Sequence, residues 1–108
     1  MPTLPTPRFD HFYRHDELTT LLRSYAEAAP HLVQLQSLGK SWEGRDIWLL
    51  VLTNSATGAH ADKPAFWVDG NIHAAELTAS TACLYWLHQL VSGYGRDAQV
   101  TQLLDTRV

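Results

Sequence analysis

The stretch GKSWEGRDIWLLVL, residues 39–52, joins a polar turn to an unbroken apolar run. Such a run, here over 47–52, is typical of a strand that is covered on both of its faces. The preceding residues, 31–38, alternate more loosely between apolar and polar side chains, as in a strand that is partly covered. We therefore predict a β-hairpin whose two faces both need other elements to cover them.

Helical patterns occur on either side of this hairpin. Residues 16–29 place Leu, Tyr and Ala side chains on one face, with Asp16 as the predicted N-cap and Pro30 as the stop. Residues from about 75 to 91 carry few charges and predict a long helix that other elements cover. A shorter helix is predicted over 97–105.

The remaining segments predict an extended arm, a loop and a third strand. Closely spaced prolines predict an extended, Pro-rich arm over 1–12, and residues 54–63 form a polar loop. Residues 64–69 predict the third strand. The order of elements predicts an α/β fold, three-layered with a mixed sheet, of which residues 13–108 hold about three strands and three helices. Because three strands make a poor independent sheet, we expect the domain to be truncated.

Composition limits the classes of function. The 108 residues carry a net charge of -3 and no run of five like charges, so we expect no nucleic-acid partner. Apolar runs are too short to span a bilayer and the N-terminus lacks a signal-peptide pattern, so we expect no membrane partner and a cytoplasmic location; secretion of a longer protein is left open. The single cysteine, Cys83, agrees with a reducing compartment.

The stretch VDGNIHAAE, residues 68–76, carries the candidate chemistry. His73 and Glu76 lie where a predicted strand runs into a predicted helix, the place at which open α/β sheets bind ligands. Imidazole nitrogen and carboxylate oxygen both suit zinc, and the i, i+3 spacing lets one turn present both donors to one ion. The alternative is a surface histidine next to a glutamate that the helix dipole stabilises.

Three neighbours of this pair are of interest. Asp69 and Asn71 are candidates for supporting the metal ligands or facing the substrate, because a ligating histidine usually donates its other N–H to a carboxylate, carbonyl or water. The simpler role of both residues, which we favour, is to cap the strand-to-helix turn. Gly70 would allow a tight backbone path at a site that must admit substrate.

Together, two stretches of this chain resemble the paired motifs of one family. GKSWEGRDI, residues 39–47, is similar to Gly-x-Ser-x-Glu-Gly-Arg-x-Ile, and VDGNIHAAE resembles the zinc signature Gly-x-His-x-x-Glu. Both motifs recur in the zinc carboxypeptidases of the carboxypeptidase A type, whose N-terminal part the chain resembles from Tyr13 onward. Two motifs in the right order, about thirty residues apart, are much harder to obtain by chance than either alone.

The resemblance implies that residues 13–108 are the N-terminal portion of a zinc carboxypeptidase-like catalytic domain, with His73 and Glu76 as two ligands of one zinc ion. In this family the third ligand, the catalytic glutamate and the substrate-binding residues lie further along the chain. We therefore expect no catalytic residue within these 108 residues, which would be inactive alone and need the C-terminal part of their own domain as a partner.

The implied activity is that of a metallocarboxypeptidase, a hydrolase that removes C-terminal residues from peptides. Many animal members carry an arginine between the two ligands, where this chain has Ala74 and Ala75 and so one cationic substrate contact fewer. Three alternatives remain: a zinc amidohydrolase or deacylase that acts on acylated amino acids, a cell-wall peptide hydrolase of the same fold, or a non-catalytic truncated segment.

Overall fold

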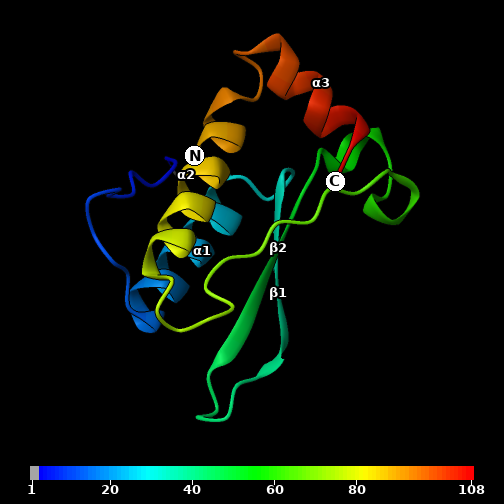
Figure 1. Ribbon diagram of the computed structural model, residues 1–108. Helices are drawn as coiled ribbons and strands as arrows, with labels where there is room; N and C mark the ends of the chain where they lie inside the picture. The colour runs from blue at the N-terminus through cyan, green and yellow to red at the C-terminus, as the bar shows by residue number, and fades with distance from the viewer. Residues whose placement is uncertain (1–2) are drawn as a thin grey trace.

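The computed structural model describes residues 3–108 (Figure 1). In chain order its elements are α1 (His15–Ala28), β1 (Val33–Lys40), β2 (Asp46–Leu52), two single-turn 3₁₀ helices (Ser55–Thr57 and His60–Asp62), α2 (Leu77–Gly93) and α3 (Ala98–Thr106). The predicted hairpin and all three predicted helices are confirmed, with ends that differ by one to two residues.

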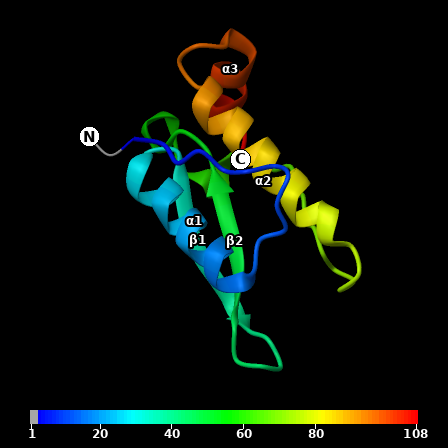
Figure 2. The same cartoon turned by 90° about the vertical axis from the view of Figure 1, so that its left-hand side faces the viewer.

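The two strands form an antiparallel hairpin that buries one face more than the other. Leu35 lies opposite Leu50, and both pack against the core. Ile47 is 49% exposed, because α1 and α2 lie on the same side of the hairpin (Figures 1 and 2). Residues 3–108 thus supply helices to one face of the hairpin only, and cover for the other face of the apolar run 47–52 stays a prediction.

The core lies between these two helices and the covered face of the hairpin. Tyr25 of α1 is fully buried, and a hydrogen bond of 2.7 Å joins its hydroxyl to Nδ1 of His88 on α2. Burial raises the pKa of Tyr25, so the hydroxyl keeps its proton at neutral pH. The other buried apolar side chains of this core are Leu22, Ala29, Leu32, Val33, Leu84, Leu87, Leu90, Val91 and Leu104.

The described part of the Pro-rich arm contains no helix or strand and crosses α1 and α2 (Figure 2). Phe9 meets Tyr85 of α2 edge-on, with ring centroids 5.1 Å apart. The Tyr13 hydroxyl accepts a hydrogen bond from the backbone N–H of Arg8 over 2.7 Å. Residues 1–2 of the predicted arm lie outside the described residues.

Helix α1 begins earlier than the sequence predicts. Its N-cap is Arg14 and not Asp16, so that prediction is wrong. The carboxylate of Glu17, three residues after the cap, accepts the backbone N–H of Arg14 over 2.8 Å, as in a capping box. Helix α1 ends at Ala28, two residues before Pro30, as expected because the residue before a proline avoids helical angles.

The third strand, predicted over 64–69, is not a regular strand in the structure. The segment is paired at one point only: the N–H of Phe66 donates to the Val108 carbonyl over 2.8 Å, and the N–H of Val108 donates to the Pro64 carbonyl over 3.1 Å. These two bonds have the pattern of a parallel strand pair. The prediction fails because a strand needs a hydrogen-bonded neighbour along its length, and within the described chain only Val108 pairs with this segment.

Helix α3 is fastened to the loop that follows β2. Asp105 accepts hydrogen bonds from the Asn54 side chain over 2.8 Å and from the Tyr94 hydroxyl over 2.7 Å. Both hydrogen bonds lower the pKa of Asp105, and the bond from Asn54 has the larger effect. Lys63 Nζ donates to the hydroxyl of the buried Thr53 over 2.8 Å. This polar network holds α3 at the end of the hairpin and so fixes where Val108 meets the 64–66 segment.

Candidate metal centre

The loop between the 64–69 segment and α2 carries the two candidate ligands. Its last residues form a hydrogen-bonded turn: the N–H of Glu76 donates to the His73 carbonyl over 3.0 Å, and the N–H of Ala79 donates to the Glu76 carbonyl over 3.1 Å. The second bond leads directly into the first turn of α2. Helix α2 therefore begins at Leu77, two residues later than predicted, because residues 73–76 form this turn instead.

The side chains of His73 and Glu76 face each other. Nδ1 of His73 lies 3.1 Å from Oε1 and 3.0 Å from Oε2 of Glu76, so the ring nitrogen points between the two oxygens. The imidazole side chain is 77% exposed and the carboxylate 46% exposed, which leaves both open to a metal ion and a substrate. An exposed ion pair of this kind contributes little stability by itself.

The donor set agrees with the chemistry of zinc. Two ligands at about 2.0–2.1 Å from one zinc ion in tetrahedral geometry stand roughly 3.3 Å apart, close to the separation of these donors. No group of three histidine, cysteine or acidic side chains gathers anywhere in residues 3–108. Two donors seldom hold zinc in competition with water, so a metal ion bound by this pair would need at least one further ligand.

Three other histidines of the described chain have partners elsewhere. Nε2 of His11 lies 3.2 Å from the carboxylate of Glu17, and Nε2 of His15 lies 2.8 Å from the Asp46 carbonyl. Nδ1 of His88 is hydrogen-bonded to the hydroxyl of Tyr25. The structure brings none of these three rings into contact with His73.

The residues predicted to support the ligands take other contacts. The carboxylate of Asp69 accepts the indole N–H of Trp67 over 2.8 Å. Within residues 3–108, no hydrogen bond joins Asp69 or Asn71 to His73, and their supporting role stays a prediction. Burial raises the pKa of the nearby Cys83 thiol, with the charge of Asp69 as the second cause, so Cys83 is kept in the protonated form that binds metals poorly.

Two backbone features of the loop were not predicted from the sequence. Asn71 has a φ of 66°, the only positive φ outside glycine in the described residues, and Gly70 lies directly against α2. The Gly70-Asn71 pair carries a local signal for the first feature, because both residues favour left-handed turns. The second depends on where α2 lies in space, which local sequence does not reveal.

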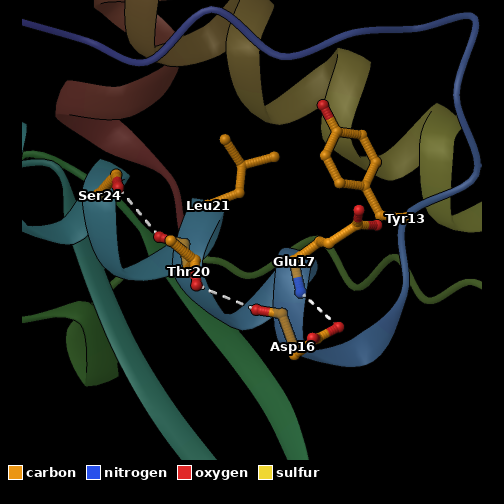
Figure 3. A pocket seen from close by; sticks show the side chains of 6 residues that line it. All are labelled: Tyr13, Asp16, Glu17, Thr20, Leu21 and Ser24. Atoms are coloured by element: carbon orange, nitrogen blue, oxygen red, sulfur yellow. Dashed lines mark hydrogen bonds between the residues drawn. The ribbon is translucent and has the colours of Figure 1, made fainter.

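A shallow hollow lies on the outer side of α1, away from these ligands (Figure 3). Its polar groups are already engaged, since the Thr20 hydroxyl donates to the Asp16 carbonyl and the Ser24 hydroxyl donates to the Thr20 carbonyl. The hollow contains neither candidate ligand, and we assign it no function. It is lined by Tyr13, Asp16, Glu17, Thr20, Leu21 and Ser24.

Comparison with known proteins connects this loop to a family. A family model described as zinc carboxypeptidase matches residues 18–108. The zinc carboxypeptidase of Saccharothrix mutabilis subsp. capreolus is 31% identical over 96 residues, which cover 89% of this chain and 22% of that protein. Carboxypeptidase M of Mus musculus is 32% identical over 98 residues, which cover 90% of this chain and 22% of that protein. The chain thus spans 22% of the length of both relatives.

A solved structure shares the spatial arrangement. The chain is similar to the crystal structure of thrombin activatable fibrinolysis inhibitor, with a TM-score of 0.80 over 92% of this chain and 24% of that one. At 23% identity this likeness concerns the fold alone, and it confirms the predicted α/β class. No helix of residues 3–108 combines the length and apolar character that a bilayer span requires.

Proposed function

This chain belongs to the zinc carboxypeptidase family, and we propose that it is part of a zinc-dependent metallocarboxypeptidase in which His73 and Glu76 hold the metal. Zinc is the metal of this family. The observation that carries the proposal is the approach of His73 Nδ1 to both carboxylate oxygens of Glu76, at 3.0 and 3.1 Å, within one turn at the start of α2. The agreement of this donor pair with zinc chemistry supports it.

Each residue has a definite task in this proposal. His73 offers a neutral ring nitrogen, and Glu76 offers a carboxylate whose charge offsets part of the charge of a divalent ion. A zinc ion held by these residues would supply Lewis-acid chemistry, which favours attack of water on a scissile carbonyl. The exposure of both side chains leaves room for the substrate. A third ligand, a general base and the groups that bind the substrate come from outside this chain.

The proposed substrate is a peptide, from which the enzyme removes the C-terminal residue. The names of the relatives, a zinc carboxypeptidase and carboxypeptidase M, support this choice. Ala74 and Ala75, between the ligands, carry no charge and are both exposed, so this loop adds no cationic contact with a substrate carboxylate. Release of an acyl group from acylated amino acids in preference to peptides would identify a deacylase of the same fold instead.

The metal assignment is tested by replacing each ligand in the protein that carries this chain. We expect His73→Ala and Glu76→Ala to lose zinc, measured by elemental analysis after dialysis, together with peptide turnover. His60→Ala is a matched control, because His60 is also exposed and lies in the separate 3₁₀ helix His60–Asp62. Zinc content equal to that of the wild type in both ligand variants would remove the proposal. The 108-residue chain alone should release no C-terminal residues, even with added zinc.

A further inference from the structure

The loop that carries the ligands approaches α2 so closely at Gly70 that only glycine fits. A Cβ atom at this position would lie 2.8 Å from the carbonyl oxygen of Ala79 and 3.0 Å from Sγ of Cys83. The Ala79 oxygen belongs to helix backbone, which cannot move aside as a flexible side chain can. Any side chain at position 70 would therefore push the loop away from the helix.

The next residue turns the chain. Asn71 has a φ of 66°, in the left-handed region that most side chains disfavour and that asparagine tolerates. The Gly-x-His signature of the family has glycine two residues before the histidine, and Asn71 occupies that place here. The chain thus keeps the backbone conformation that glycine allows while using asparagine to adopt it.

The same helical residue fixes both ends of the loop. The carbonyl oxygen of Ala79 abuts Gly70, while the N–H of Ala79 donates to the Glu76 carbonyl over 3.1 Å. The N–H of Glu76 in turn donates to the His73 carbonyl over 3.0 Å. His73 is therefore held between a close contact before it and a hydrogen-bonded turn after it, both built on the first turn of α2.

We propose that Gly70 and Asn71 are positioning residues of the zinc half-site. The close approach of Gly70 to Ala79 sets how near the loop lies to α2, and the left-handed turn at Asn71 sets the direction of His73. Together they aim Nδ1 of His73 at the carboxylate of Glu76 before any metal binds. This inference rests on the proposed function, because it assigns a role in holding the same metal ion.

The test compares zinc affinity, measured by competition with a chromogenic chelator, among variants of the protein that carries this chain. We expect Gly70→Ala and Asn71→Ala to bind zinc at least about tenfold more weakly, the lower end of the effect seen when supports of metal ligands are removed. Asn71→Gly restores the freedom of the backbone and should stay within about threefold of the wild type.

Gly44→Ala is the matched control for backbone strain. Gly44 has a φ of 78° in the hairpin turn, and nothing lies within 4 Å of an added Cβ. Alanine at this position therefore has the same left-handed backbone strain as alanine at position 71, but it is remote from the ligands. We expect this variant to lose thermal stability without a change in zinc affinity. If Gly70→Ala does not fold, the two Asn71 variants carry the test.

Two results would overturn the inference: wild-type zinc affinity in Asn71→Ala, or an equal loss in Asn71→Gly and Asn71→Ala. The second would mean that the side-chain amide matters and the turn does not. Failure of the proposed function has a different signature, namely wild-type zinc content in His73→Ala and Glu76→Ala. Loss of zinc in those two variants, with full affinity in the positioning variants, would refute only the inference drawn here.

Discussion

Removal of one buried hydroxyl should measure how firmly α1 and α2 are joined. Tyr25 is fully buried, and its hydroxyl forms a hydrogen bond of 2.7 Å with Nδ1 of His88. Tyr25→Phe keeps the ring, its volume and its edge-on contact with the imidazole, whose centroid lies 6.2 Å away. Only the hydrogen bond between the two helices is lost.

The expected loss of stability in Tyr25→Phe has two parts, the lost hydrogen bond and the His88 nitrogen left without its partner. A hydrogen bond of this kind contributes about 0.5–1.5 kcal/mol net, and a buried acceptor left without a partner costs about 1–3 kcal/mol. Because His88 is only partly buried, water can reach its ring in part, and the second cost falls at the low end of its range. We expect Tyr25→Phe to lower the free energy of unfolding by about 1–2.5 kcal/mol.

The assay is urea unfolding of the protein that carries this chain, followed by circular dichroism. Tyr13→Phe is the matched control, since it also removes a tyrosine hydroxyl, here one that accepts the exposed N–H of Arg8. It should lower the free energy of unfolding by less than about 0.5 kcal/mol. Adding His88→Leu to Tyr25→Phe removes both polar partners, so the double variant should lose less than the sum of the single losses. Equal losses in Tyr25→Phe and Tyr13→Phe would refute the reasoning.

Two further predictions concern α3. The Asp97 carboxylate accepts two backbone N–H groups at the start of this helix. Asp97→Ala should therefore lower the free energy of unfolding, measured in urea, by about 1 kcal/mol, and Asp97→Asn should lower it by less. Equal losses of stability in the two variants would exclude a capping role. The lowered pKa of Asp105 makes its stabilisation complete above the unfolded value, about 4, and lost as the pH falls through the lower folded value. Thermal unfolding at several pH values should therefore show a gap in Tm between wild type and Asp105→Asn that closes in acid; a gap independent of pH would contradict this.

Features with a local cause were predictable from the sequence. The long helix follows from its apolar residues, of which Leu84, Leu87, Leu90 and Val91 are buried, and the hairpin follows from the apolar run 47–52. The i, i+3 spacing of His73 and Glu76 agrees with the 3.0 Å between their side chains, while their role as metal ligands stays a prediction. Each of these depends on residues a few positions apart.

Features set by distant parts of the chain were not predictable. Pairing of the 64–69 segment depends on a neighbour more than forty positions away, at Val108, and this contact covers one residue instead of six. The contact of Gly70 with Ala79 depends on how the loop folds back on α2. The N-cap of α1 was misplaced for a subtler reason, because Asp16 and Glu17 both suit the first turn and the capping box selects Glu17.

The contacts that shape the half-site all lie within residues 70–83, so they have low contact order and can form as soon as the start of α2 is wound. Under the proposed function the remaining ligand comes from outside this chain and would arrive only with long-range assembly. The loop that carries His73 and Glu76 would then form early in folding, and tight zinc binding would follow late. Resistance of bound zinc to a chelator would consequently report completion of the domain, and the time at which it appears during refolding would separate assembly of the sheet from formation of the loop.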